Sequence, residues 1–166
     1  MRDSPRIEGR DDASALRLAI VMSAYHAPVT EGLRDGALAA LARASAEPGP
    51  AVPVITVPGA FELPLAARRA AESGAFDALV CLGCVVRGET PHFDYIASAV
   101  AHGIMAASQE TGVPISFGVL TTNTLEEAQA RAGEGSSNKG WEAAMAAVQL
   151  ANTLRALPGA AGGAAV

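Results

Sequence analysis

The stretch "ALVCLGCVV", residues 78–86, contains no charged side chain. A strand with one face in water alternates apolar and polar residues, whereas a strand covered on both faces is apolar throughout. Three other runs share this largely apolar pattern: "LRLAIVM" (16–22), "AVPVITV" (51–57) and "VPISFGVL" (113–120). The four runs therefore predict the strands of a parallel sheet that has helices on both faces.

The segments that follow these strands carry the 3.6-residue apolar repeat of helices. They are residues 29–46, 62–73, 93–111, 124–132 and 139–156. Thr30 and Thr124 are expected helix starts, and the glycines of "ESG" (72–74) and "ETG" (110–112) are expected left-handed helix ends. The order of elements predicts one doubly wound α/β domain over residues 16–157, with flexible tails at 1–15 and 158–166.

Composition argues against several classes of protein. The chain has 166 residues and a net charge of −5, and its basic residues form no stripe, which disfavours a nucleic-acid groove. The first residues are charged where a signal peptide needs an apolar stretch, and no apolar run reaches the ~18 residues of a membrane span. We expect a soluble, cytoplasmic protein.

Cys81 and Cys84 form a C-x-x-C pattern inside the predicted strand 78–86. Residues three apart on a strand point to opposite faces and lie about 10 Å apart, whereas a disulfide needs Cα atoms within about 7 Å. No second cysteine pair exists to complete a zinc site. We expect two buried, unreactive thiols, with Cys84 near a site through its backbone.

The loops that leave the strands differ in kind from those that enter them. Entering loops are plain turns, whereas the leaving loops hold aromatic, acidic, basic and imidazole side chains. These loops are "SAYHAPVT" (23–30), "PGAFELP" (58–64), "RGETPHF" (87–93) and "TTNT" (121–124). Because the carboxyl ends of parallel strands share one edge of the sheet, where ligands bind, a site is predicted there.

Within that edge, Thr90 precedes a helix expected to begin near Phe93. Free amide groups and the helix dipole at such a position favour an anion such as phosphate. His92 beside it is suited to proton transfer. Tyr25 can stack on a flat heterocycle, and Glu62 can accept hydrogen bonds from sugar-like hydroxyls.

Plainer roles stay open for the same residues. Thr90 can be an ordinary helix cap, and Arg87 can pair with Glu89 in solvent. Tyr25 can pack on the core, and Glu62 can be an acid favoured by the helix dipole. Arg131 and Lys139, at the ends of the bend "RAGEGSSNK", can be solvated cations, and His102 is expected to be structural. The chain has neither a triphosphate-binding nor a dinucleotide-binding glycine motif.

Four longer segments carry a resemblance to a known family. The chain closely resembles lumazine synthases, over about residues 16–156. This resemblance implies a flavodoxin-like, three-layer sandwich with a four-stranded parallel sheet. The matching segments are "VPGAFELPLAA" (57–67), "GCVVRGETPHFDYI" (83–96), "PISFGVLTTNTLEEAQARAG" (114–133) and "NKG" (138–140).

The family condenses 5-amino-6-ribitylaminouracil with 3,4-dihydroxy-2-butanone 4-phosphate to give 6,7-dimethyl-8-ribityllumazine, with loss of phosphate and water. The resemblance implies that His92 transfers protons and that no metal or organic cofactor takes part. It implies that the pyrimidine substrate is bound by Tyr25, Ala60, Phe61, Glu62, Cys84, Val85, Val86 and Phe117. It implies that phosphate is bound by Glu89 through its backbone, Thr90 and Arg131, with Arg87, Lys139 and His26 as additional candidates.

The resemblance also implies an assembly. Family members form pentamers, in some cases twelve of them in a hollow 60-subunit shell, with Phe117 and Arg131 reaching the pocket of a neighbouring subunit. Riboflavin synthase is among the partner proteins that the resemblance allows. The chain departs from common family patterns at Tyr25–His26 and in "EGSSNKG" (134–140), where Glu134 is hypothesised to weaken contacts between pentamers.

Two other functions stay open from the sequence. One is a non-catalytic protein of the same fold that binds lumazine or riboflavin, or forms a shell. The other is a flavodoxin-like electron carrier, because that topology also binds phosphate at a loop leaving a strand. His92 and Arg131 favour catalysis over storage, since storage needs no proton transfer.

Overall fold

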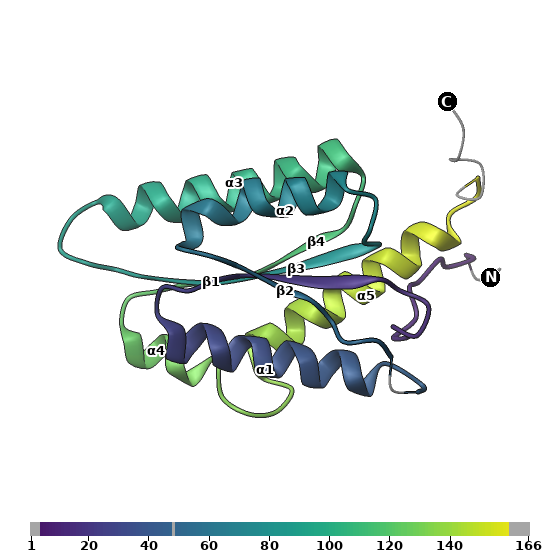
Figure 1. Cartoon of the computed structure of the whole chain (residues 1–166), viewed down its shortest axis with the longest axis horizontal. Coiled ribbons are helices and arrows are strands. Elements are labelled where there is room, and N and C mark those ends of the chain that lie inside the picture. The colour runs from purple at the N-terminus through teal and green to yellow at the C-terminus, as the bar shows by residue number, and fades with distance from the viewer. Residues whose placement is uncertain (1–3, 48, 160–166) are drawn as a thin grey trace.

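The computed structural model describes residues 4–47 and 49–159, and it confirms the α/β sandwich (Figure 1). The parallel sheet has the order β2-β1-β3-β4, and its strands are β1 (Leu18–Ser23), β2 (Val54–Val57), β3 (Ala78–Val86) and β4 (Ile115–Thr122). The predicted strand 78–86 coincides with β3. The other three predicted strands overlap β1, β2 and β4 with ends that differ by up to three residues.

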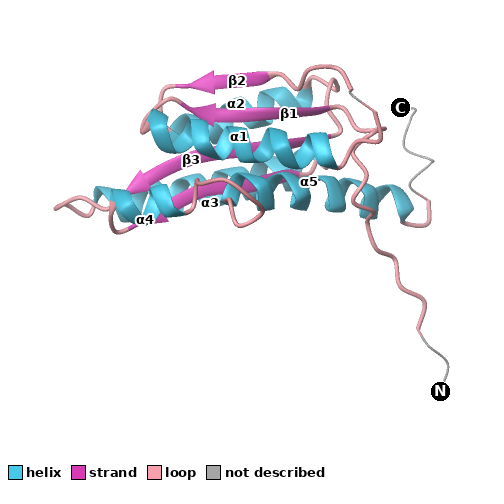
Figure 2. Cartoon of the chain, turned by 90° about the horizontal axis from the view of Figure 1, so that it is seen from below, coloured by secondary structure: helices cyan, strands magenta, loops and turns pink. Residues whose placement is uncertain are grey.

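Helices cover both faces of the sheet, as Figures 1 and 2 show. One face carries α2 (Leu63–Glu72), which follows a short 3-10 turn at Ala60–Glu62, and α3 (His92–Thr111). The other face carries α1 (Ala27–Arg43), α4 (Leu125–Ala130) and α5 (Lys139–Ala156). No helix in the described ranges is long and apolar enough to cross a membrane.

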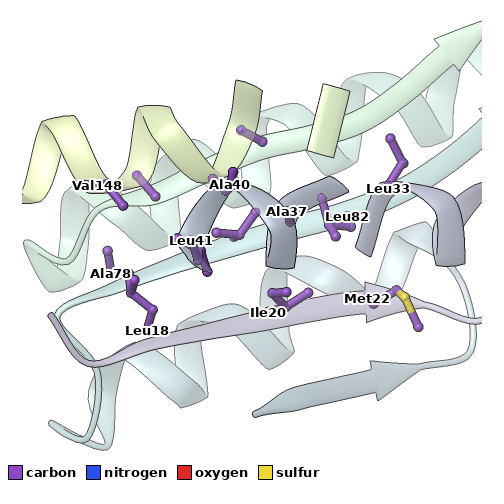
Figure 3. Close-up of a cluster of buried hydrophobic side chains, with 14 of the residues drawn as sticks. Leu18, Ile20, Met22, Leu33, Ala37, Ala40, Leu41, Ala78, Leu82 and Val148 are labelled. Carbon is purple, nitrogen blue, oxygen red and sulfur yellow. The ribbon is translucent and has the colours of Figure 1, made fainter. Parts of the chain in front are cut away.

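Two apolar layers, one on each face of the sheet, explain why the strands are apolar throughout. In the layer of Figure 3, Ile20 and Leu82 on the strands meet Leu33 of α1 and Val148 of α5. All four of these side chains are fully buried. In the second layer, fully buried side chains of β1 and β3 pack with those of α2 and α3; they include Val21, Leu79, Leu63 and Val100.

Three of the four expected helix ends are confirmed. Thr124 is the N-cap of α4, and its hydroxyl accepts a hydrogen bond from the Glu127 amide at 3.2 Å. Gly74 and Gly112 follow α2 and α3 with φ of 69° and 70°. An added Cβ would strain this left-handed conformation, which is why glycine occurs at both positions.

The fourth expectation, a helix start at Thr30, is wrong. Helix α1 begins at Ala27 with His26 as its N-cap, and the buried Thr30 hydroxyl donates back to the Ala27 carbonyl at 3.4 Å. Pro28 explains the earlier start. Its fixed φ suits the first turn of a helix, and an amide there has no partner within the helix anyway.

The segment before β1 lies against the last turns of α5. The Asn152 side-chain amide donates to the carbonyls of Arg10 and Asp12, each at 2.8 Å, and the Gln149 amide donates to an Asp11 carboxylate oxygen at 2.7 Å. That the domain begins at residue 16 stays a prediction. The contacts above show that residues 10–12 also lie against α5. The predicted tail 158–166 lies outside the described residues from residue 160 on.

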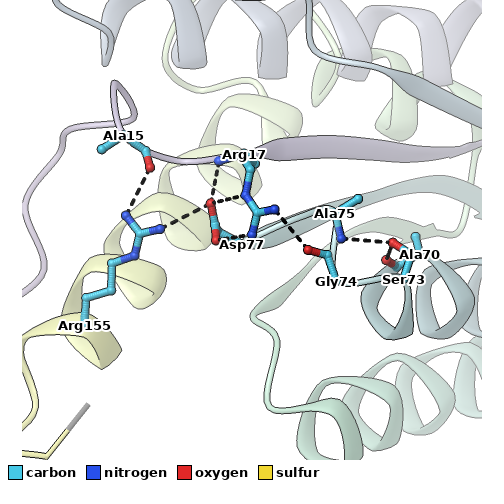
Figure 4. A network of polar contacts seen from close by, with 8 residues as sticks. All are labelled: Ala15, Arg17, Ala70, Ser73, Gly74, Ala75, Asp77 and Arg155. Carbon is cyan, nitrogen blue, oxygen red and sulfur yellow. Dashed lines mark hydrogen bonds and ion pairs between the residues drawn. The ribbon is translucent and has the colours of Figure 1, made fainter. Parts of the chain in front are cut away.

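An ionic cluster joins the same region to the amino end of β3 (Figure 4). The Asp77 carboxylate accepts hydrogen bonds from the Arg17 amide at 2.7 Å and from the Arg17 guanidinium at 2.9 and 3.2 Å. Arg155 of α5 approaches the same carboxylate at 3.2 Å. Burial raises the pKa of Asp77, but the hydrogen bonds from Arg17 and the charge of Arg155 outweigh it, so the pKa lies below its usual value.

Candidate active site

The loops that leave β1 and β2 are joined to each other at the carboxyl edge of the sheet. The Ala24 amide donates to the Val57 carbonyl at 2.8 Å, and the Tyr25 amide donates to the Pro58 carbonyl at 3.1 Å. The parallel sheet therefore holds the residues after β1 beside those after β2, although they are separated by the whole of α1 in the chain.

Tyr25 and His26 form an aromatic pair on this edge. Their ring centroids lie 4.5 Å apart with the planes at 62°, and the Tyr25 side chain is 67% exposed. This exposure contradicts the alternative in which Tyr25 packs on the core, and it leaves the ring open to a flat ligand. His26 has φ of 58°, a left-handed conformation that costs a residue with a Cβ about 1 kcal/mol or more.

Glu62 stabilises the turn after β2 through a hydrogen bond within the turn. One Glu62 carboxylate oxygen accepts a hydrogen bond from the Gly59 amide at 3.0 Å. Because a carboxylate has about four acceptor positions, this bond fixes the side chain and leaves capacity for ligand hydroxyls. Ala60 is buried, whereas Phe61 is 59% exposed next to it.

The loop after β3 presents its polar side chains to solvent. Glu89, Thr90 and His92 are all exposed, while the preceding Val85 and Val86 are half-buried. Helix α3 begins at His92, with Pro91 at its cap position and no side chain bonded to its first amides. Thr90 is therefore not the helix cap, and the start of this 20-residue helix offers amide groups to an anion.

Arg87 does not pair with Glu89, as one alternative from the sequence had it. Its guanidinium pairs with Asp94 at 3.0 Å instead, because the first turn of α3 returns over the end of β3. Both carboxylate oxygens of Asp94 therefore bond to Arg87.

The two cysteines lie on opposite faces of β3, as predicted. Cys81 belongs to the apolar layer under α2 and α3, and Cys84 belongs to the layer under α1 and α5. Both thiols are free and buried. Burial raises the pKa of Cys81 to about 12 and that of Cys84 to about 11, so neither is a ready nucleophile.

Three candidate residues lie away from this group, along the open edge of β4. Phe117, Arg131 and Lys139 line a cavity of about 410 Å³ between β4 and α5. Phe117 is 45% exposed and pairs in register with Cys81, so it lies in the middle of the strand rather than at the carboxyl edge. The residues that line this cavity do not include Tyr25, Glu62 or His92.

The two cations at this edge are held differently. The Lys139 ammonium contacts both carboxylate oxygens of Glu142, at 2.7 and 2.8 Å. The Arg131 guanidinium donates to the Glu127 carbonyl at 2.8 Å and has no ion pair with an acid in the part of the chain that the structure describes. Arg131 is therefore the better placed of the two to bind an external anion.

Asn138 supports this edge, and our sequence reasoning assigned it no role. It is 2% exposed, and its side-chain oxygen accepts hydrogen bonds from the amides of Gly140 at 2.7 Å and Trp141 at 3.3 Å. An asparagine directly before the helical pattern of 139–156 is a helix-start signal that could have found it. His102 is exposed on α3, with its ring nitrogen 2.8 Å from the Ser98 carbonyl of its own helix, and its structural role stays a prediction.

Comparison with known proteins identifies the family of the chain. The model of the family described as 6,7-dimethyl-8-ribityllumazine synthase matches residues 15–155. A relative named 6,7-dimethyl-8-ribityllumazine synthase, from Syntrophus aciditrophicus (strain SB), is 51% identical over 148 residues, which cover 89% of this chain and 96% of the relative. The chain belongs to the 6,7-dimethyl-8-ribityllumazine synthase family.

Proposed function

We propose that this lumazine synthase carries out its condensation at the carboxyl edge of the sheet, with His92 as the proton-transfer residue. The observation that carries the proposal is the position of His92, exposed at the start of α3 and two residues after the exposed Thr90. Joining an amine to a ketone with loss of water moves protons between nitrogen and oxygen. An imidazole beside an anion site is suited to that transfer.

The two substrates occupy separate parts of this edge. The exposed Tyr25 ring stacks on the pyrimidine, and Glu62, fixed by the Gly59 amide, accepts hydrogen bonds from the ribityl chain. The backbone at Ala60 and Phe61 and the end of β3 at Cys84, Val85 and Val86 line the same pocket. The phosphate of the butanone lies at the start of α3, against the Glu89 backbone and Thr90. Much of the rate then comes from orienting the two substrates side by side.

We further propose that a neighbouring subunit completes the site. Phe117 and Arg131 lie along the open edge of β4, apart from the loops after β1, β2 and β3. A second chain placed with that edge against these loops would bring Arg131 to the phosphate and Phe117 to the pyrimidine. Lys139, bonded to Glu142, has a supporting place on the same edge.

Exposed apolar side chains support an assembly of identical subunits, for which we propose a pentamer or a shell of twelve pentamers. Leu65 of α2 and Tyr95 and Met105 of α3 are 66%, 73% and 58% exposed, and α3 has no charged residue from 95 to 109. Such a surface is typical of an interface. Sedimentation that shows pentamers alone across salt and pH would count against the shell. A cytoplasmic location and riboflavin synthase as a partner stay predictions.

The test of the proposed mechanism is lumazine formation from both substrates, followed by absorbance, after the uncatalysed condensation is subtracted. His92→Ala is expected to lower the acceleration about a hundredfold, the low end of general acid–base contributions, while the orientation of the two substrates is kept. The matched control is His102→Ala on the same helix, which is expected to keep full activity.

Either of two results would contradict the proposal. Equal activity of the His92 and His102 variants would remove the proton-transfer role. Tight product binding by the unaltered protein without acceleration would favour the storage or scaffold function, and Tyr25–His26 would then be the first residues to exchange.

A further inference from the structure

Arg87 is fastened to the end of the neighbouring strand. Its amide donates to the Thr122 carbonyl at 2.9 Å, which extends the β3–β4 ladder by one bond. Its guanidinium Nε donates to the Asn123 side-chain oxygen at 3.2 Å. Arg87 therefore has a fixed position relative to the sheet.

The other side of the same guanidinium holds the first turn of α3. Nη1 and Nη2 donate to the two carboxylate oxygens of Asp94 at 3.3 and 3.0 Å, and Cζ lies 4.2 Å from the centre of the Phe93 ring. A two-point bond with a stacked ring fixes orientation as well as distance. We call Arg87, Asp94 and Asn123 the clamp.

The clamp closes a loop that has little packing of its own. Residues 88–92 are all exposed, and a Cβ added to Gly88 would meet nothing within 4 Å. Glu89 and Thr90, the residues proposed to bind phosphate, lie inside this loop. Its conformation therefore depends on its two ends, and the clamp ties those ends together across Arg87 and Asp94.

Within the clamp, the Arg87 guanidinium is already bonded to acceptors of the chain and is less available to a phosphate. Three guanidinium nitrogens of Arg87 are each bonded to an acceptor of the chain, and the Asp94 carboxylate balances the positive charge. An arginine in this state orients its neighbours and is poorly placed to become a ligand itself.

We propose that Arg87 is a positioning residue for the phosphate-bearing substrate, acting through Asp94 and without touching the phosphate. It fixes the loop 88–91 so that the Glu89 backbone and the Thr90 hydroxyl are already in place before binding. Preorganisation of this kind improves binding because no loop has to be ordered when the ligand arrives. This inference rests on the phosphate site proposed above.

The test measures KM for each substrate separately in the assembled enzyme. Arg87→Gln and Asp94→Asn are each expected to raise KM for the butanone phosphate about tenfold, a size typical of one broken pair in contact, and to change KM for the pyrimidine less than about twofold. The double variant is expected to be no worse than either single variant, because both break the same pair. Arg87→Lys keeps the charge but loses the two-point bond, so it is expected to raise KM for the butanone phosphate nearly as much as Arg87→Gln.

A matched pair elsewhere provides the control. Arg68 of α2 and Glu110 of α3 form an ion pair whose side chains are 46% and 52% exposed, against 44% and 59% for Arg87 and Asp94. Arg68→Gln is expected to leave both KM values unchanged. A general loss of stability would shift both KM values and the melting temperature together, and that result would overturn the positioning role.

Direct binding of phosphate by Arg87, the alternative, predicts a change in KM of the opposite direction for Asp94→Asn. If Arg87 binds phosphate itself, Asp94→Asn frees it and lowers KM for the butanone phosphate, and Arg87→Lys restores binding; either result overturns the inference. Thr90→Val separates the two proposals. If Thr90→Val leaves KM for the butanone phosphate unchanged, both the proposed phosphate site and this inference are wrong. If Thr90→Val raises that KM but the Arg87 and Asp94 variants do not, only this inference is wrong.

Discussion

Replacing Asn138 by alanine tests how the bend before α5 is held. The Asn138 side chain accepts hydrogen bonds from the amides of Gly140 and Trp141, and its own amide donates to the carbonyls of Gly32 at 3.0 Å and Gly133 at 2.6 Å. One buried side chain thus joins α1, the bend and the start of α5.

The expected loss follows from what each partner can do after the change. Losing the helix cap costs about 1–2 kcal/mol. The Gly133 carbonyl lies on an exposed bend and can bond to water. Gly32 is half-buried and lies within α1, so its carbonyl keeps the helical bond from the amide four residues on, and losing the second bond from Asn138 costs about 1 kcal/mol. Together, Asn138→Ala is expected to lower the free energy of unfolding by about 2–3 kcal/mol.

Urea unfolding measures this loss, at one fixed protein concentration because association changes apparent stability. Asn138→Ser keeps an oxygen for the cap but loses both donated bonds, so its loss is expected to be about half that of alanine. The matched control is Asn152→Ala: this half-buried residue on the same helix also bonds two carbonyls, but in exposed hydrogen bonds, and its expected loss is below about 1 kcal/mol. A loss below about 1 kcal/mol in Asn138→Ala, or a serine variant no better than alanine, would refute the reasoning.

Three further outcomes are expected. The Ser23 hydroxyl is the one buried side-chain polar atom without a hydrogen-bond partner in the described chain. Ser23→Ala is therefore expected to raise stability by up to about 1 kcal/mol. Thermal melting checks this, and a clear loss of stability would indicate that the hydroxyl has a partner. Asp77 has a lowered pKa, so its stabilising effect is present above its ordinary pKa and is lost as pH falls through the folded-state value. Asp77→Asn is therefore expected to destabilise at pH ~7, and unfolding curves are expected to show the difference shrinking as pH falls below the ordinary aspartate pKa of about 3.9. Cys81 and Cys84, with pKa values raised to about 12 and about 11, are expected to react with a thiol reagent far more slowly in the native than in the unfolded protein, and equal rates would contradict their burial.

Much of the fold could be predicted because the relevant forces are local or act through periodicity. The run 78–86 is apolar throughout because helices lie on both sides of β3, and its bounds follow directly from that burial. Thr124, Gly74 and Gly112 end or begin helices through their own side chain or backbone. The start of α1 was misplaced because Thr30, a common cap residue, lies three residues inside a helix that Pro28 already favours.

The candidate site was predictable as a place but not as a set of contacts. Parallel strands bring their carboxyl ends together, so the loops after β1, β2 and β3 were expected to meet. The partner of Arg87 was not predictable, because the choice between Glu89 and Asp94 depends on how the chain turns into α3. The burial of Asn138 likewise depends on how closely α1 approaches the bend, a contact over 106 positions of sequence.

The attachment of residues 10–12 to Asn152 and Gln149 bears on how the protein can be modified. Arg155 also donates to the Ala15 carbonyl at 3.1 Å, so the beginning of the domain and the end of α5 run side by side next to the amino ends of the strands. His92, Tyr25 and Glu62 lie at the opposite edge of the sheet. An affinity tag or a reporter domain fused to either terminus is therefore connected to the domain through residues 10–12 or the end of α5, which lie on the side of the sheet remote from the candidate site.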